Sequence, residues 1–453
     1  MSPYEALPLQ TKPEPDLSGT VEDLLEQFGI SQHGFLPKDA PLGRLPDPYF
    51  APWESLMQDL PHLLSSQTFR QHADELPVLS TARLATEAEQ RQAYVVLCFL
   101  AHAYIWGGDT ASDILPPSIS VPILAISDTL DLPPVATYAA LNLWNYTLST
   151  ASPASPAAPI PLECIASQHT FTGTLDESWF YAVSIAIESL AAPLIPLMLR
   201  ALAPFSTTAA APAPSRNYTE LTAALQTLAA GIHELSALLD RMDEHCDPST
   251  FYHRIRPFLA GSKNMGAAGL PNGVFYDQGD GKGEWRQHRG GSNGQSSTVQ
   301  FLDLVLGVEH RGVGDRKKGG EVTFHEEVRG YMPREHRRFL QWLGEWAPGG
   351  ARGVVVAAGE KGVGVVECRE AFGAATEALA EFRGRHLRMV TRYIVVPARR
   401  AAMANGSGGV RNLASRPSEG KGADGLTGTG GTALLPFLKE ARDETARAGD
   451  VVR

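Results

Sequence analysis

Apolar residues recur every three or four positions along most of the chain, the spacing of amphipathic helices. The first such segment, TVEDLLEQF, starts at Thr20, which suits a helix N-cap because acidic residues follow it in the first turn. The same spacing predicts helices over 83–103, 133–148, 177–202, 219–245, 297–306, 370–396 and 434–448. Strand patterns are few, so we predict a mostly α fold.

Two linkers rich in Ser, Pro and Ala interrupt this pattern, at 148–161 and 206–215. Such segments neither bury an apolar face nor pair as strands, so we place a domain boundary at the first of them. We expect a small, mainly helical N-terminal domain over 1–160, with a disordered Pro-rich start, and a large all-helical domain over 161–453. Within the latter, 404–432 is Gly-rich and predicts a mobile loop.

Composition excludes several classes of protein. The chain has 453 residues, of which 43% are hydrophobic, so it can bury a core and is not wholly disordered. Its net charge of −11 is uneven, with 9 Lys and Arg against 28 Asp and Glu up to residue 250, and 30 against 22 beyond. An anionic ligand therefore suits the C-terminal half. The basic residues form no dense stripe, so we expect no nucleic-acid partner.

The sequence predicts neither a secretory signal nor a membrane-spanning segment. The N-terminus has neither a basic nor an apolar signal region. The most apolar stretch, 181–202, is broken by Glu188, Pro193, Pro196 and Arg200, so we expect no membrane span. Four scattered cysteines form no disulfide framework and no zinc knuckle. We expect a soluble, cytoplasmic protein.

Common catalytic motifs are missing. The sequence has no HExxH, no GxSxG and no GxxxxGK[ST], which excludes zincins, α/β-hydrolases and P-loop proteins. GDGKG at 279–283 resembles a phosphate loop only superficially, because no convincing strand precedes it.

His386 lies in the middle of the apolar face of the predicted 370–396 helix, with Arg383 beside it. An imidazole on an apolar face bordered by arginines suits the proximal side of a haem, with the ring nitrogen on iron and an arginine on a propionate. Taken alone, the residues favour the alternative, a core histidine hydrogen-bonded to a carbonyl. By contrast, His336 lies in the charged run REHRR, and we expect it to be solvated.

Two further residues are candidates for a binding pocket. Arg256 follows Phe251 and Tyr252, so a guanidinium and aromatic rings could together hold an aromatic amino acid; the alternative is a structural salt bridge. Ser184 is a hydroxyl within an apolar helix, where it either faces a ligand or bonds the carbonyl four residues earlier.

Eight segments, in order from about residue 100 to 440, resemble the indoleamine 2,3-dioxygenase family of haem tryptophan dioxygenases, in its fungal form. They are AYIWG (103–107), LPPVATYAALNLWNY (132–146), WFYAVSIAIE (179–188), RIRPFLAGSKN (254–264), GGSNGQSSTVQFLDLVLG (290–307), YMPREHRRFL (331–340), RHLRMVTRYIVVPA (385–398) and GTGGT (428–432).

The resemblance implies a role for each matching position. His386 matches the proximal iron ligand and Arg383 the arginine that pairs with a haem propionate, while Arg256 matches the arginine for the substrate carboxylate. The remaining matches are Phe251 and Phe180 as distal aromatics, Tyr138 and Ser184 over the indole, Ser292 near a propionate, Thr429 in a loop that closes over the substrate, and Asp303 as a proximal carboxylate that takes the other ring proton of His386. Asn293 departs from the family, where a small apolar residue is expected.

The implied activity is insertion of both atoms of O₂ across the indole C2=C3 bond of L-tryptophan, giving N-formyl-L-kynurenine, the first step of the kynurenine pathway. It implies one haem b per chain, a separate electron donor that reduces the iron, and a monomer. Whether this serves tryptophan catabolism or NAD biosynthesis stays open. Two alternatives also stay open: a haem-binding paralogue that acts on another indole or as a haem or redox sensor, and a helical interaction protein without a cofactor.

Overall fold

The computed structural model describes residues 15–149, 158–209, 217–310, 324–358, 364–404 and 434–450. It is 65% helical with a few short strands, which confirms the predicted mostly α class. Most of the predicted linker at 148–161 and of the predicted loop at 404–432, including Thr429, lies outside the described residues.

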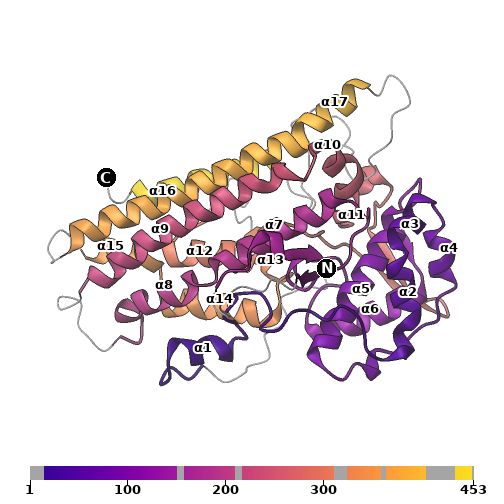
Figure 1. Ribbon diagram of the computed structural model, residues 1–453, viewed down its shortest axis with the longest axis horizontal. Coiled ribbons are helices and arrows are strands. Elements are labelled where there is room, and N and C mark those ends of the chain that lie inside the picture. The colour runs from indigo at the N-terminus through magenta and orange to yellow at the C-terminus, as the bar shows by residue number, and fades with distance from the viewer. Residues whose placement is uncertain are drawn as a thin grey trace.

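The N-terminal helices gather on one side of the molecule (Figure 1). Thr20 caps α1 in a capping box with Asp23, as its position predicted, and Thr86 caps α5 in the same way with Glu89. α5 is buried almost all round and forms the centre of this group. The helices of this group are α2 (Ala51–Gln58), α3 (Leu60–Ser65), α4 (Phe69–Asp74), α5 (Glu87–Trp106) and α6 (Pro117–Leu130), whereas α1 (Val21–Gln27) lies apart from them, beside the long helices of the other side.

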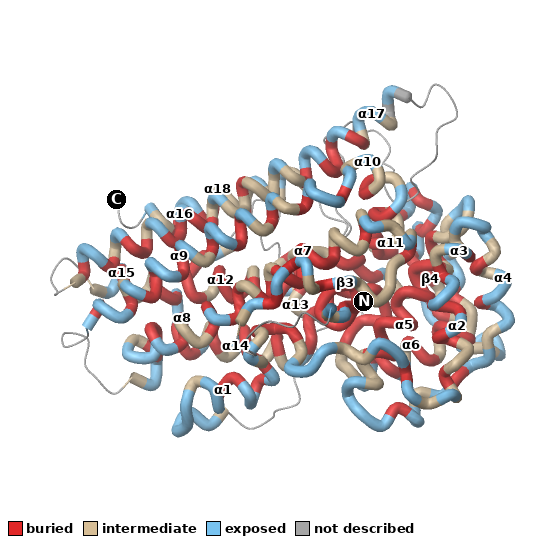
Figure 2. The backbone as a smooth tube through the Cα atoms, viewed as in Figure 1, coloured by how far each residue is buried: buried red, intermediate tan, exposed pale blue. Residues whose placement is uncertain are grey.

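The other side is built from long helices, with α16 running along α9 (Figure 1). Each has one buried face and one exposed face (Figure 2), as expected of amphipathic helices. They are α7 (Leu175–Ala191), α8 (Leu194–Leu202), α9 (Thr219–Asp240), α12 (Ser297–Leu306), α13 (Phe324–Arg329), α14 (Arg334–Trp346), α15 (Gly350–Ala357), α16 (Val365–Val390), α17 (Val396–Ala404) and α18 (Leu434–Gly449), with the short α10 (Pro248–Thr250) and α11 (Arg256–Leu259) between α9 and α12.

Two hydrophobic cores hold these elements together. One joins α2, α5, α6 and α7, and the other joins α8, α9, α12, α14 and α16. α1 contributes Leu24 and Leu25 to the second core although it begins the chain. The domain division at residue 160 stays a prediction.

The strands are short. β4 (Val274–Gly279) pairs with β1 (Ile114–Leu115) and β5 (Lys282–Arg286), and β2 (Tyr146–Leu148) pairs with β3 (Ile165–Ser167). Asp280 and Gly281, at φ of 52° and 72°, make the two-residue turn between β4 and β5. GDGKG is therefore the turn of a hairpin, and the expectation that no strand precedes it was wrong.

Other predictions need correction. The helix expected over 133–148 is a π-helical turn η3 (Ala139–Leu143) followed by strand β2, and the helix expected over 177–202 is divided between α7 and α8 at Pro193. His336 is buried rather than solvated, because its Nδ1 lies 3.0 Å from Ser297 Oγ and its ring packs on Phe35.

The stretch Leu175–Phe205 is long and apolar enough to cross a membrane by length and composition. Most of its apolar window is buried inside the fold, however, where α7 and α8 supply residues to both cores. Burial in a core accounts for its composition.

Candidate active site

A cavity lies among α7, α12, α13, α16 and α18, and most of the predicted site residues line it. The empty space, including its open mouth, is about 1870 Å³. Much of this space is open solvent, and the part comparable with the cavity volumes of other proteins is about 240 Å³. The predicted residues that line it are Tyr138, Phe180, Ser184, Phe251, Arg256, Ser292, Arg383 and His386.

Three π-helical turns border this cavity. They are η3, η8 (Phe251–Ile255) and η12 (Thr391–Val395), and each contributes lining residues. A π-turn widens a helix by one residue and is frequent at functional sites. Here the turns bring Asn142, Phe251 and Tyr393 to one space from distant parts of the chain.

His386 lies near the end of α16, on the cavity wall, with Phe382 and Met389 one turn away on either side. Its enclosure by these side chains, together with the charge of Arg383, lowers the pKa of His386 to about 4. The imidazole is therefore neutral near neutral pH, which is the form that ligates a metal. A neutral imidazole on an apolar wall fits the axial ligand of a haem.

Arg383 reaches the cavity from the preceding turn of α16, where Asp303 of α12 holds it. One guanidinium nitrogen of Arg383 lies 2.7 Å from both carboxylate oxygens of Asp303. Asp303 therefore positions Arg383, and its predicted link to the ring proton of His386, directly or through water, stays a prediction. A propionate at Arg383 would share the guanidinium with Asp303.

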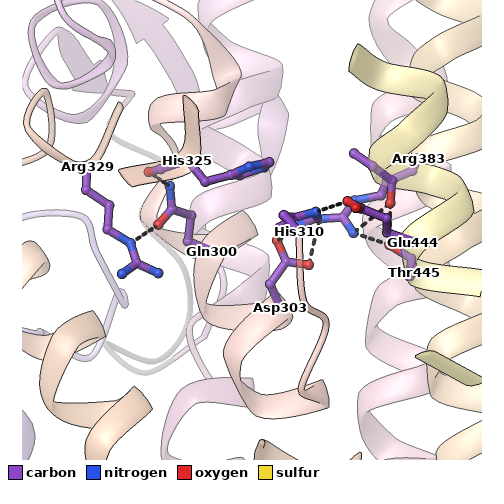
Figure 3. Close-up of polar contacts among 9 residues, drawn as sticks. Gln300, Asp303, His310, His325, Arg329, Arg383, Glu444 and Thr445 are labelled. Carbon is purple, nitrogen blue, oxygen red and sulfur yellow. Dashed lines mark hydrogen bonds and ion pairs between the residues drawn. The ribbon is translucent and has the colours of Figure 1, made fainter. Parts of the chain in front are cut away.

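The pair belongs to a larger network that ties α12 and α16 to α18 (Figure 3). His310 Nε2 lies 3.0 Å from Asp303 Oδ2, its Nδ1 lies 2.8 Å from Glu444 Oε2, and its ring stacks on His325. Burial opposes ionisation of Asp303, but the charges of Arg383 and His310 outweigh it and hold its pKa well below its usual value.

Aromatic rings form an apolar part of the cavity lining. The Phe180 and Phe251 rings lie 4.8 Å apart, and the Phe251 ring meets Tyr393 edge-on at 5.7 Å. Ser184 lies on the same wall, and its Oγ donates a long hydrogen bond of 3.4 Å to the Phe180 carbonyl. Ser184 thus lines the cavity and also bonds the carbonyl of the preceding turn.

Tyr138 lines the cavity, but its hydroxyl has a structural partner. It donates to Glu188 Oε1 at 2.9 Å, and the same carboxylate accepts from Ser296 Oγ at 2.6 Å and from Thr298. Burial raises the pKa of Glu188 despite these donors. The sequence analysis noted Glu188 only as a charge that breaks an apolar stretch. A carboxylate in such a stretch is a signal for a buried acceptor of several hydrogen bonds, which is the role it has here.

Arg256 begins α11, directly after η8, and its side chain is buried at the cavity. Burial lowers its pKa, although a guanidinium stays protonated in proteins. The Tyr252 ring lies 5.8 Å from its guanidinium carbon. A buried cation at an aromatic-lined cavity can bind the carboxylate of an aromatic amino acid.

Sequence reasoning missed several lining residues. Asn142 follows Tyr138 by one turn, and Gln300 lies on α12. His325 comes from α13 and Phe437 from α18. Gln300 is itself held by Arg329, as Figure 3 shows. None has a local pattern that distinguishes it, because the contacts that bring it to the cavity are long-range.

Comparison with known proteins shows the family of the chain. A family model described as indoleamine 2,3-dioxygenase matches residues 24–448. The chain is 37% identical to the indoleamine 2,3-dioxygenase of Saccharomyces cerevisiae over 441 residues, which are 94% of each chain. It is 38% identical to a 6-hydroxytryptophan 2,3-dioxygenase of Fusarium equiseti, covering 93% of this chain and 96% of that protein.

Similarity extends to mammals. The indoleamine 2,3-dioxygenase 1 of Rattus norvegicus is 32% identical over 430 residues, covering 94% of this chain and 95% of the rat protein. Members of this family are haem-dependent dioxygenases that act on tryptophan or related indoles. On this evidence the chain belongs to the indoleamine 2,3-dioxygenase family and is an oxidoreductase.

Proposed function

We propose that the protein binds one haem b through His386 and converts L-tryptophan and O₂ to N-formyl-L-kynurenine. The observation that carries this proposal is one cavity holding a neutral histidine on an apolar wall, a pair of packed phenylalanines and a buried arginine. Both oxygen atoms end in the product and the indole C2–C3 bond breaks, so the net reaction consumes no external electrons. Haem, when bound, supplies the iron that binds and activates O₂.

The chain's own residues position the substrate. Arg256 binds the carboxylate, and the rings of Phe180 and Phe251 orient the indole by packing against it. Ser184 is a cavity-lining hydroxyl on the same helix as Phe180, and its bond to the Phe180 carbonyl makes it a weak candidate for a base. We therefore assign the protein the tasks of binding, orienting and excluding water, without proton removal by a side chain.

Other assignments follow from the resemblance. Ser292 and Arg383 would contact the haem propionates. Arg383 would remain paired with Asp303 while it does so. Thr429 would close over the bound amino acid. A monomeric, cytoplasmic enzyme with a separate electron donor stays a prediction.

The test is an absorbance spectrum of the purified, haem-reconstituted and reduced protein, followed by addition of L-tryptophan in air. We expect a Soret band and growth of the near-ultraviolet absorbance of N-formyl-L-kynurenine. A Soret band without product would favour the paralogue that acts on another indole or as a sensor. Absence of haem binding would contradict both.

The ligand assignment has its own test. His386→Ala should lose stable haem loading, whereas His233→Ala, which removes an exposed histidine of α9, should load haem as the wild type does. The ratio of Soret to protein absorbance after desalting measures both. Normal loading of His386→Ala would mean that another residue holds the iron.

One observation favours a second candidate substrate. Three amides, those of Asn142, Asn293 and Gln300, line the cavity along with its aromatic rings. A relative named as a 6-hydroxytryptophan 2,3-dioxygenase is as similar to this chain as those named for indoleamine. The substrate of this chain could thus be a substituted tryptophan.

A further inference from the structure

His325 brings an imidazole to the cavity whose nitrogens have no hydrogen-bond partner among the described residues. It lies on α13, is half-buried and belongs to the cavity lining. Its ring contacts the rings of His310, Phe324 and Phe437. Neither ring nitrogen is among the described polar atoms that are buried without a partner, so both keep accessible surface. The imidazole can therefore bond a ligand.

His310 positions the ring of His325. The two rings stack with their centroids 3.9 Å apart and their planes at 6°. His310 is itself fixed between two carboxylates, since its Nε2 lies 3.0 Å from Asp303 Oδ2 and its Nδ1 lies 2.8 Å from Glu444 Oε2. Figure 3 shows the His325 side chain extending from α13 to this stack.

The same stack determines the charge of His325. An imidazole that bonds a carboxylate through each nitrogen carries a proton on both, so His310 is a cation. Burial, together with the charge of His310, lowers the pKa of His325 to about 3. His325 is therefore neutral near neutral pH, with one N–H donor and one acceptor nitrogen.

The charges around the cavity favour an anionic group. Its described lining includes Arg256 and Arg383 but no Asp or Glu. The charges of Arg383 and His310 both act on His325, so its ring lies in the field of these two cations. A carboxylate of a ligand at Arg383 would therefore also be attracted towards His325.

Arg383 alone is poorly equipped to hold such a carboxylate, because both of its terminal nitrogens already have partners. Nη2 lies 2.7 Å from both oxygens of Asp303, and Nη1 donates to Thr445 Oγ1 and, at 3.4 Å, to the Ala441 carbonyl. A second carboxylate would share these donors with Asp303 and be repelled by its charge. An additional N–H donor would stabilise it.

We propose that His325 binds a haem propionate, donating its ring N–H to the carboxylate that Arg383 also contacts. This inference rests on the proposed function, because it assumes that the cavity holds haem on His386. His310 is then a positioning residue, which two carboxylates fix and which in turn fixes the ring of His325.

The test compares the rate of haem release from the wild type, His325→Phe and His325→Gln. Each protein is reconstituted with ferric haem and mixed with excess apomyoglobin, and the Soret band follows the transfer. Phenylalanine keeps a ring that can stack on His310 but has no N–H. We expect His325→Phe to release haem about tenfold faster, the scale of one hydrogen bond to a charged group.

Two further variants control for folding and for the donor. Glutamine retains an N–H, so His325→Gln should keep a release rate close to that of the wild type. His325→Leu also lacks the N–H and should release haem as fast as His325→Phe, which keeps the test valid if either of these two variants folds poorly.

A modified cofactor isolates the propionate. Haem dimethyl ester has the same ring and iron but no carboxylate charge. We expect the wild type and His325→Phe to release this ester at nearly equal rates, because the charged group that His325 binds is missing. The four rates form a double-mutant cycle, in which a general loss of stability cancels.

Equal release of haem by the wild type and His325→Phe would overturn the proposal. So would an equal acceleration for haem and its dimethyl ester, which would assign His325 a packing role. Failure of the proposed function differs from both. A wild type that shows no Soret band would overturn the function and this inference together, whereas haem loading without conversion of tryptophan would contradict the activity while the release rates still decide the role of His325.

Discussion

Arg256 is a buried cation whose proposed partner is a substrate. A carboxylate that binds the buried guanidinium of Arg256 gains a charge-assisted hydrogen bond in a poorly solvated place. Arg256→Ala should therefore raise the KM for tryptophan by about 10- to 100-fold, the equivalent of about 1.5–3 kcal/mol.

Steady-state kinetics measure this change, and the Soret band of the same preparation is the control. We expect haem loading to stay normal, because Arg256 contacts the substrate rather than the cofactor in this assignment. Loss of haem from Arg256→Ala would contradict the assignment.

Individual residues also show where sequence reasoning stops. The apolar spacing around His386 correctly predicted a side chain that faces an enclosed apolar space. The charged neighbours of His336 led to the wrong prediction that it is solvated. Arg337 and Arg338 pair with Asp131 and Glu335, whereas the His336 ring faces Ser297. Which neighbour decides a histidine's environment depends on contacts across the fold.

At the level of elements, α18 is attached to the site by His310. Burial alone would lower the pKa of His310, but Asp303 and Glu444 outweigh it and raise the pKa above its ordinary value. A raised pKa in the folded state means that this histidine stabilises the fold fully below about pH 6.5, the pKa of an unfolded histidine. The contribution is lost as pH rises through the raised value.

We therefore expect His310→Gln to destabilise the protein more at about pH 6 than at about pH 9. Urea unfolding at the two values measures the difference, and the exposed His233→Gln is the control. A pH-independent difference would show that His310 acts through packing on His325 alone.

A second element, the segment 288–292, reaches the cavity only because two backbones touch. A Cβ on Gly290 would lie 2.1 Å from the Leu259 carbonyl oxygen and 2.4 Å from Gly261 N. Gly290→Ala must push the segment outward, which should cost about 1–3 kcal/mol and shift Ser292 at the cavity wall.

Gly266→Ala is the matched control, because its Cβ would meet nothing closer than 3.7 Å. Urea midpoints and haem retention after desalting measure both variants. Equal behaviour of the two would mean that the close approach at Gly290 relaxes without disturbing the site.

For the whole molecule, the sequence predicted the fold class and most of the long helices. It placed 297–306 correctly, because Ser296 caps the helix and Gly307 ends it in the left-handed region at φ of 73°. It failed over 133–148, where burial rather than helical packing explains the apolar residues. The cavity itself combines residues from 138 to 441, and no local pattern encodes such contacts.

Haem binding at the cavity should also affect the stability of the whole molecule. A group that binds only the folded state stabilises it, by about 2.7 kcal/mol when present at 100 times its dissociation constant. We expect haem-reconstituted protein to melt at a higher temperature than protein stripped of haem, and the difference to vanish in His386→Ala. Scanning calorimetry of the three samples measures this, and equal melting of the first two would contradict haem binding at the cavity.

The three π-turns give the cavity a dependence on chain length. Each is one residue longer than a turn of α-helix, and one residue corresponds to about 100° of rotation. A π-turn absorbs this rotation, so deleting a single residue from η12 would leave a continuous α-helix from α16 into α17 whose two parts face as before, but the widened turn that brings Tyr393 and Ile394 to the cavity would be lost. The length of these turns, and not only the identity of their side chains, is therefore under constraint, and a deletion there can remove the shape of the site while leaving every lining residue in the sequence.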